Sequence, residues 1–229
     1  AQGGWRDFPM DTRNLIRNAR PFQGLPGDIL DIIEHKAAVR TYDAGVVIVN
    51  ETEPVSGLSV VLDGRVKLSK TSSEGKEQTL ALLEQGEPFG LCTAFASSDF
   101  PASAVTLTRT TVLTLPGSTL QEIARQEPLI LLNVIRLLSE RLRETMELVE
   151  TLSLKDLPQR IALFILHDLS RQAPCHGITL ELAVTHRELA KIVGASPEAL
   201  SRALRRMAQQ GILTVDGRKI TVHDRRGLE

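Results

Sequence analysis

A set of polar side chains near the carboxyl end of the chain recurs at helical spacing and suits the edges of base pairs. The set, at positions i, i+3, i+4 and i+7, is Glu198, Ser201, Arg202 and Arg205. Residues with this spacing share one face of a helix. Arg202 can donate two hydrogen bonds to guanine O6 and N7, Glu198 can accept one from a cytosine amino group, and the methylene group of Ser201 can lie near a thymine methyl. The set therefore predicts sequence-specific contact with double-stranded DNA.

Two short helices are predicted to position this set. The first is expected to begin with a capping box of Thr185 and Glu188 and to stop at Gly194, which permits a sharp turn. The second is expected to begin at Ser196 as its cap, with Pro197 at its first position, where the missing amide proton costs no hydrogen bond. Its apolar positions should face the core and are Leu200, Ala203, Leu204 and Met207.

A hairpin is predicted after the second helix, because ILTV and KITV alternate apolar and polar residues around the turn signal Asp216-Gly217. Two helices followed by a hairpin are the outline of a winged helix-turn-helix. Side chains around the polar set that is expected to read base edges are in turn expected to contact phosphates. They are Thr185, Arg187, Lys191, Ser196 and Arg206.

Composition limits how the chain can bind nucleic acid. With 229 residues, of which 42% are hydrophobic, the chain is long enough for two domains. Its formal net charge of −1 excludes a surface covered with basic residues. From residue 156 to 229 there are eleven Lys and Arg against eight Asp and Glu (11 − 8 = +3), while the remainder has sixteen against twenty (16 − 20 = −4). Aromatic residues make up 3%, so stacking on single strands is not expected.

The first half of the chain has the pattern of an antiparallel β domain. From about Arg40 to Leu115, glycines separate short runs such as VVIVN and RVKLSK, which is typical of a barrel or sandwich. A helix should precede it at PGDILDIIEHKA. The expected fold class is α+β, with a sensory β-barrel domain of jelly-roll type and N-terminal helices at 1–117, a dimerisation helix at 118–154 and a winged helix-turn-helix at 155–229.

A long helical stretch, roughly Ser118 to Thr151, carries apolar residues at alternating steps of four and three. This spacing is typical of the a and d positions of a helix pair, so a parallel homodimer is expected. The alternative is a helix packed on its own barrel. The predicted dimer interface consists of Leu131, Ile135, Leu138, Leu142, Thr145, Val149 and Leu152.

The order of these parts resembles the CRP/FNR family of bacterial transcription regulators, over nearly the whole chain. The supporting motifs are GEPFG at Gly86 to Gly90, LSLKDLPQRIALFIL after the long helix, and SPEALSR. Glu198, Ser201 and Arg202 match the E-x-x-S-R pattern of the FNR-like branch. The resemblance implies a palindromic operator with TTGA-type half-sites and contact with RNA polymerase.

The same resemblance argues against two effectors. Cyclic-nucleotide-binding members have Glu directly after the Phe-Gly pair and an Arg-Ser pair further on, whereas this chain has Leu91 and then FPASAVTL. Between Thr71 and Ala124 the basic residues are Lys76 and Arg109, so a buried phosphate would lack a paired cation. The N-terminal cysteines that hold the FNR iron-sulfur cluster are absent. The two cysteines, Cys92 and Cys175, lie far apart and fit no metal-ligand spacing.

An apolar effector pocket is predicted instead, and it is expected to be bordered by Phe89, Leu91, Cys92, Leu138 and Leu142. Departures of this kind resemble the nitrogen-oxide-sensing and HcpR-like branches, which suggests haem as cofactor and nitric oxide as signal. An axial ligand would have to be His35, Cys92 or Met146, or a histidine brought in by the DNA-binding domain. Ligand binding is expected to act through the hinge around residues 154–158 and reorient the two DNA-binding domains.

Two other functions are weighed against this one. A cupin-like enzyme would need two or three metal-binding histidines on the barrel strands, and none lies between His35 and His167, so no enzyme activity and no metal site are expected. The second alternative is an effector-independent dimeric DNA-binding protein whose barrel is purely structural. No bilayer-spanning apolar run and no signal peptide are found, so a cytoplasmic protein is expected.

Overall fold

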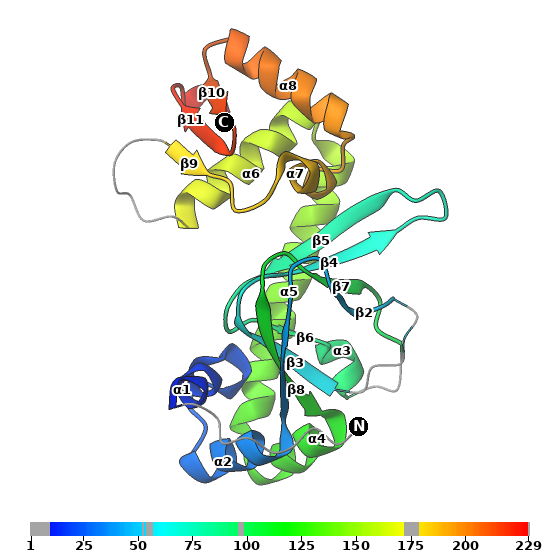
Figure 1. The fold of residues 1–229 in the computed structure, drawn as a ribbon, viewed down its shortest axis with the longest axis vertical. Helices are drawn as coiled ribbons and strands as arrows, with labels where there is room; N and C mark the ends of the chain where they lie inside the picture. The colour runs from blue at the N-terminus through cyan, green and yellow to red at the C-terminus, as the bar shows by residue number, and fades with distance from the viewer. Residues whose placement is uncertain (1–9, 52, 54–56, 96–98, 172–178, 229) are drawn as a thin grey trace. The chain divides into compact units, whose positions relative to one another are not determined.

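Short strands dominate the chain before residue 117, and helices dominate the rest of it (Figure 1). The computed structural model describes residues 10–51, 53, 57–95, 99–171 and 179–228. The helices are α1 Met10–Asn18, α2 Gly27–Lys36, α3 Leu91–Ala94, α4 Gly117–Gln126, α5 Leu129–Leu154, α6 Leu157–Arg171, α7 His186–Ile192 and α8 Pro197–Gln209, with 3-10 helices η1 Arg20–Phe22 and η2 Arg226–Leu228. The strands are β1 Ala38–Tyr42, β2 Val47–Val49, β3 Gly57–Asp63, β4 Val66–Thr71, β5 Glu77–Leu83, β6 Pro88–Phe89, β7 Ser103–Thr106, β8 Thr110–Pro116, β9 Thr179–Glu181, β10 Leu213–Asp216 and β11 Lys219–Val222.

The chain forms two compact units. The first consists of Ala1–Lys70 with Ala81–Arg143, and the second of Thr71–Leu80 with Glu144–Glu229. The division falls inside α5, and the end of the β4–β5 hairpin belongs to the second unit. The sequence-based boundaries instead follow the start of α4 and the end of α5.

Strands β1 to β8 are arranged in two four-stranded sheets. Their orders are β1-β8-β3-β6 and β2-β7-β4-β5, with antiparallel pairing of β1 and β3 to β8 and of β2 and β4 to β7. The α+β fold class and the jelly-roll arrangement are therefore confirmed, although the sheets do not close into a barrel. Gly90 ends β6 with φ +80°, and a Cβ atom there would lie 2.6 Å from the Gly57 carbonyl oxygen. This turn thus requires glycine.

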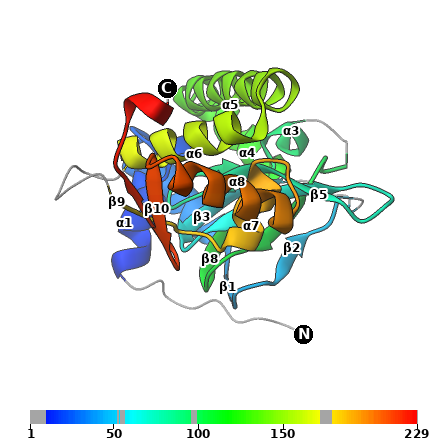
Figure 2. The same cartoon turned by 90° about the horizontal axis from the view of Figure 1, so that it is seen from above.

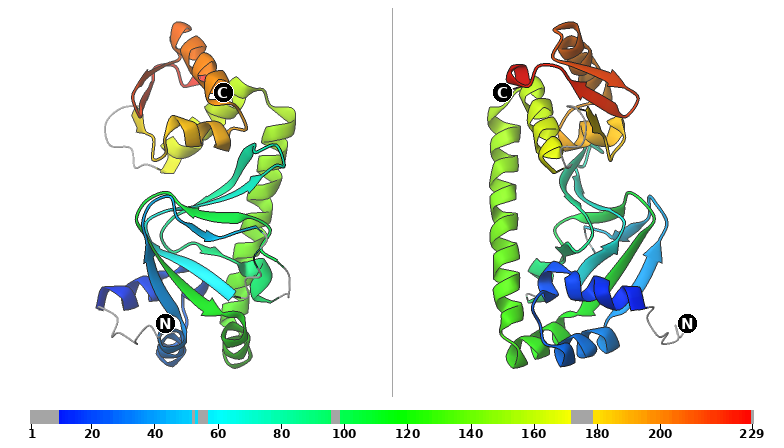
Figure 3. Two further views of the ribbon diagram at one scale, coloured as in Figure 1. Left: turned by 45° about the vertical axis from the view of Figure 1, so that its right-hand side comes forward. Right: turned by 90° about the vertical axis from the view of Figure 1, so that its left-hand side faces the viewer.

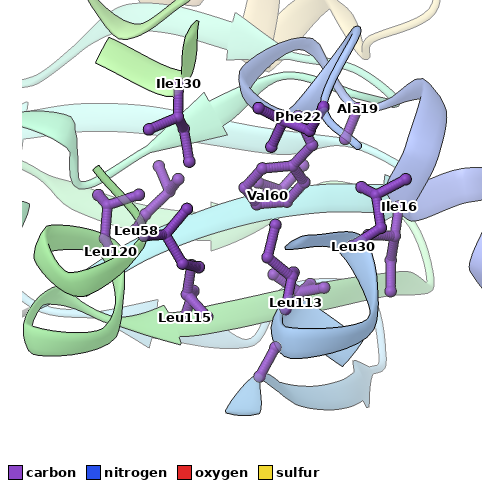
Figure 4. Close-up of a cluster of buried hydrophobic side chains, with 14 of the residues drawn as sticks. Ile16, Ala19, Phe22, Leu30, Leu58, Val60, Leu113, Leu115, Leu120 and Ile130 are labelled. Atoms are coloured by element: carbon purple, nitrogen blue, oxygen red, sulfur yellow. The ribbon is translucent and has the colours of Figure 1, made fainter. Parts of the chain in front are cut away.

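The central strand β3 is buried on both faces. Leu58, Val60 and Leu62 pack into a cluster with side chains of α1, α2, β8, α4 and α5, as Figure 4 shows for most of its members. Val61 points to the opposite face and joins a second cluster with Phe89. Because successive side chains of a strand alternate between faces, one short run supplies both clusters. Burial of each such side chain contributes about 1.5–3 kcal/mol.

The helical stretch expected from Ser118 to Thr151 is divided into α4 and α5. Pro128 follows Glu127, whose backbone is extended at φ −130° and ψ 91°. A proline disfavours helical backbone in the residue before it, so α4 ends there. From Leu129 onward α5 continues as one unbroken helix of 26 residues (Figure 3).

Helices α6, α7 and α8 and a three-stranded sheet make up most of the second unit. Figure 2 looks nearly along α5 and shows α6 beginning where α5 ends. Helix α8 packs on α6, α7 and β10, and the sheet has the order β10-β11-β9. The predicted winged helix-turn-helix is therefore present, with one strand, β9, that the sequence pattern did not indicate.

Candidate nucleic-acid interface

Side-chain caps fix where α7 and α8 begin. The Thr185 hydroxyl accepts a hydrogen bond from the Glu188 amide at 3.2 Å, and the Ser196 hydroxyl accepts one from the Ala199 amide at 3.2 Å. Pro197 occupies the first turn of α8. Each cap satisfies an amide that has no partner within the helix, so both predicted helix starts are confirmed.

The turn between the two helices is a Schellman motif. The Ala195 amide donates to the Ala190 carbonyl at 2.8 Å across Gly194, whose φ is +69°. A Cβ atom on Gly194 would lie 2.9 Å from Leu152 Cδ2, because the turn packs against the last part of α5. Left-handed backbone and close packing both favour glycine at this position.

Helix α8 presents two different faces. Leu200, Leu204 and Met207 are at most 4% exposed and point to the core of the unit. The predicted base-reading residues and one predicted phosphate contact are all exposed, namely Glu198, Ser201, Arg202, Arg205 and Arg206. Since α8 packs on its apolar side, the polar row remains accessible to a ligand as large as a DNA duplex.

Hydrogen bonds at the first turn of α8 hold Glu198 in its charged form. The amide of Glu198 itself and then the Ser196 hydroxyl lower the pKa of the Glu198 carboxyl from 4.5, and the charge of Arg202 acts in the same direction. Desolvation acts in the opposite direction and raises the pKa, but these groups together outweigh it. The carboxylate is therefore an acceptor at neutral pH, as contact with a cytosine amino group requires.

The wing is the hairpin of β10 and β11, which pair from Leu213 with Val222 to Asp216 with Lys219. The two residues between the strands are Gly217 and Arg218, one position later than the expected Asp216-Gly217 turn. Arg218 donates from Nε and Nη2 to the Leu182 carbonyl at 2.9 and 2.7 Å. The turn of the wing is thereby tied to the segment that precedes α7.

The side chains predicted to contact phosphates differ in whether they already have partners within the protein. Arg187 is exposed, and the hydroxyls of Thr185 and Ser196 are exposed but already serve as helix caps. Lys191 Nζ lies 2.8 Å from Glu188 Oε1 and 2.6 Å from Glu77 Oε2. Burial lowers the pKa of Lys191, but these two carboxylates outweigh that effect and raise it above 10.5. Contact between Lys191 and a phosphate would thus compete with two ion pairs.

Two polar residues near the turn were not predicted. Gln78, at the end of the β4–β5 hairpin, donates to the Ile192 carbonyl at 3.2 Å. Arg160 donates to the Val193 carbonyl at 3.3 Å, and also to the Leu152 carbonyl in the last turn of α5 and to the Lys155 carbonyl just after it. No local pattern reveals Gln78, because it is 114 residues from its partner. Arg160 lies in the LPQRIA segment that follows the long helix, but the pattern of that segment does not indicate its role.

The first half of α5 has a packed face, and an exposed apolar face continues into its second half. Ile130, Asn133, Val134 and Leu137 are buried, and Asn133 Nδ2 donates to the Gln23 carbonyl at 2.8 Å. Of the predicted dimer residues, Ile135, Leu138, Leu142 and Val149 are 59%, 41%, 64% and 58% exposed, and Thr145 is also exposed. Leu131 packs on the first core cluster, and Leu152 lies beside Gly194. Met146, at 65% exposed, extends the apolar row although it was not predicted.

The predicted effector residues do not gather in one cluster. Phe89 packs with Phe100 in the second core cluster, at 6.3 Å between ring centroids, while Leu91 packs against the first. Cys92, Leu138 and Leu142 are exposed. The stretch from Thr71 to Ala124, in which the sequence was searched for a cation, does not include Lys67. This lysine lies on β4 in the first unit and is buried, at 4% exposed.

Metal and membrane sites receive no support from the described part of the chain. Within residues 10–51, 53, 57–95, 99–171 and 179–228, no three His, Cys, Asp or Glu side chains are grouped to hold a metal ion. No helix among these residues is both long and apolar enough to cross a membrane. Cys175, the second cysteine, lies outside the described residues.

Comparison with known families matches both parts of the chain. Residues 39–127 match the cyclic nucleotide-binding domain family, and residues 159–229 match the Crp-like helix-turn-helix domain family. The first match covers most of the two β-sheets, and the second covers α6 to the wing.

Similar proteins have the same order of parts. The cyclic AMP receptor protein of Thermus thermophilus is 32% identical over 208 residues, which cover 91% of this chain and 94% of that protein. The global nitrogen regulator of a Nostoc species is 30% identical over 190 residues, covering 81% and 85%. Among solved structures, FixK2 from Bradyrhizobium japonicum has a TM-score of 0.72 at 27% identity and covers 84% of this chain and 95% of that one.

The identity and coverage extend over both units, including the helix-turn-helix that carries the exposed polar row. These relatives are transcription regulators and not enzymes, which agrees with the expectation that the chain is not an enzyme. The chain belongs to the CRP/FNR family of transcription regulators.

Proposed function

We propose that the chain is a dimeric, effector-responsive regulator that binds a palindromic DNA operator with TTGA-type half-sites. The observation that carries the proposal is the exposed polar row on α8, which lies opposite a buried apolar row. In a helix-turn-helix, the amino-terminal part of the second helix contacts base edges in the major groove. Glu198, Ser201 and Arg202 occupy that part of α8.

Each of these side chains suits one kind of base contact. Arg202 is exposed and can approach guanine O6 and N7 with two donors. Glu198 is held in its charged form and can accept from cytosine, and Ser201 offers a small apolar edge to a thymine methyl. Arg206 and Arg187 would then bind phosphates and fix the register without selecting bases.

A homodimer follows from the exposed apolar row of α5. Ile135, Leu142, Met146 and Val149 are each at least 58% exposed, and water contact with such a row is unfavourable. Pairing two copies of α5 would bury the row and give a two-fold dimer with two α8 helices. Two recognition helices about 34–36 Å apart match successive major grooves, so the operator is palindromic.

A small effector is proposed to bind the first unit, and a cyclic nucleotide is not favoured. The Thermus relative is named for cyclic AMP, but this chain has Leu91 where cyclic-nucleotide binders have a glutamate after the Phe-Gly pair. Leu91 packs against the first core cluster and offers no acceptor for a ribose hydroxyl. A signal other than a cyclic nucleotide therefore suits this chain better.

Haem with nitric oxide as signal is the specific candidate, and its ligands can be compared with the structure. His35 lies on α2, and its Nδ1 is 2.7 Å from the Asp31 carbonyl oxygen. Cys92 and Met146 are exposed. Because none of the three is a buried axial ligand within one chain, they favour haem no more than another small ligand. Titration of the dimer with haem tests this candidate. A Soret band that shifts with nitric oxide supports haem, and the absence of such a band excludes haem.

The proposed function is tested by selecting duplexes from a random DNA pool with the purified chain, with and without candidate effectors. Enrichment of an inverted repeat of TTGA-type half-sites is the expected result. Affinity that is the same with every effector tested would instead favour the effector-independent alternative, in which the sheets of the first unit are purely structural. Contact with RNA polymerase, proposed from the family, is tested by transcription from a promoter that carries the selected site.

A further inference from the structure

The carboxyl ends of two helices meet at one side chain in the second unit. Arg160, near the start of α6, donates from Nε to the Lys155 carbonyl at 2.9 Å and from Nη2 to the Leu152 carbonyl at 2.9 Å. Its Nη1 donates to the Val193 carbonyl at 3.3 Å. The Leu152 carbonyl belongs to the last turn of α5, the Lys155 carbonyl follows directly after that helix, and the Val193 carbonyl belongs to the C-cap of α7.

These carbonyls need partners for a general reason. The last carbonyls of a helix have no amide partner within the helix, and the carboxyl end of the helix dipole is partially negative. A guanidinium group is planar, permanently charged and has donors in a fixed fork, so it can bond three carbonyls in fixed directions. A lysine ammonium is a single point donor and lacks this geometry.

A second contact joins the same two segments. The Leu152 side chain lies under the α7–α8 turn, where a Cβ atom on Gly194 would approach Leu152 Cδ2 to 2.9 Å and Arg160 Nη1 to 3.4 Å. The end of α5 is thus fixed to the turn by one apolar contact and one guanidinium. Because α8 begins directly after this turn, its orientation relative to the end of α5 depends on both.

We propose that Arg160 is a positioning residue that fixes the recognition helix to the end of the dimerisation helix and so sets the half-site spacing that the dimer accepts. The inference rests on the proposed function, since spacing has meaning only for a dimer on a palindrome. Arg160 is not expected to touch a base. Its loss should therefore leave binding to one half-site intact and weaken the discrimination between operators that differ only in spacing.

The test uses the full chain and two sets of duplexes. One set carries two TTGA-type half-sites with the centre-to-centre distance at its best value or lengthened by one to three base pairs. The other carries one half-site, with the second replaced by unrelated sequence. Affinities are measured for the wild type, Arg160→Met, Arg160→Lys and the control Arg125→Met, which alters an exposed arginine on α4.

For Arg160→Met, the ratio of affinities for best and lengthened spacing should fall by about tenfold or more, because simultaneous engagement of two sites depends on their geometry. Its affinity for one half-site should stay within about twofold of wild type, Arg160→Lys should be intermediate, and Arg125→Met should match wild type. An unchanged ratio in Arg160→Met overturns the proposal, as does an equal loss on both sets, which would indicate a structural role alone. A wild type that does not prefer two half-sites over one overturns the proposed function and this inference with it.

Discussion

Arginines on α8 are expected to divide into one that selects bases and one that binds the backbone. Replacing Arg202 by alanine should cost about 1–3 kcal/mol at a single base pair and relax selectivity there, because two donors to guanine are lost. Replacing the exposed Arg206 should weaken binding to all sequences alike and reduce the salt dependence by about one counterion.

Competition binding against operators with every single-base change, at two salt concentrations, distinguishes these roles. A uniform loss for Arg202→Ala over all sequences would show that Arg202 contacts only phosphate. A position-specific loss for Arg206→Ala would assign base reading to a residue that is expected to bind only the DNA backbone.

The lowered pKa of Glu198 gives a prediction about pH. The folded-state pKa lies below 4.5, so the carboxylate stays charged from about pH 8 to pH 5 and protonates only as pH falls through the lowered value. Preference for its base pair should therefore be constant over this range. Glu198→Gln, which cannot be charged, serves as the control and should show the altered preference at every pH. Loss of the wild-type preference with a midpoint above pH 5 would contradict the assignment.

At the residue scale, sequence reasoning identified groups whose partners are local. The caps of Thr185 and Ser196 bond amides three residues away, so spacing alone predicted them. Lys191 could not be treated in this way, because its second partner, Glu77, is far away in the sequence and belongs to a hairpin that folds with the second unit. The Lys191 ammonium group, which was predicted to contact phosphate, is paired in the fold with a carboxylate from a distant part of the sequence.

At the element scale, the Ser196 cap should determine the stability of the start of α8. Ser196→Ala removes the acceptor for the Ala199 amide and should lower the free energy of unfolding by about 0.5–2 kcal/mol, whereas Ser196→Gly should lower it by only a few tenths. Denaturant unfolding monitored by circular dichroism gives both values. Equal stability of the alanine variant and the wild type would show that this cap is dispensable.

Element ends were predicted where a residue type determines them and missed where pairing does. Gly194 and Pro197 mark the turn and the start of α8, as their backbone preferences require. The break at Pro128 was also available from sequence, because proline disfavours helical backbone in the residue before it, yet one continuous helix was predicted there. Strand β9 has only three residues and is stabilised by β11, so no local pattern could reveal it.

For the whole molecule, the exposed row of α5 should hold two copies together. Leu142→Glu would place a charge in the buried seam of the dimer and should shift the chain to monomers at micromolar concentration. Val47→Glu, on β2 and 47% exposed, adds the same charge outside the row and should leave the dimer intact. Sedimentation equilibrium measures both. A dimer that persists in Leu142→Glu would place the interface elsewhere.

The whole-molecule prediction from sequence was accurate for fold class and family, and least specific for the signal. Fold class follows from the switch between strand and helix periodicity, which many residues determine together. An effector site depends on a few side chains brought together by tertiary packing. Phe89 and Leu91 are two residues apart, yet they pack in different clusters, which the sequence pattern did not indicate.

The most direct test of the proposed function is binding of the purified chain to one duplex with an inverted repeat of TTGA-type half-sites and to a matched duplex with both half-sites scrambled. Fluorescence anisotropy gives the two affinities, and sedimentation of the complex gives its stoichiometry. The expected result is two chains per duplex and at least about a thousandfold preference for the inverted repeat. Equal affinity for the two duplexes, or a single chain bound to the inverted repeat, would contradict the proposal that this protein is a dimeric reader of that sequence.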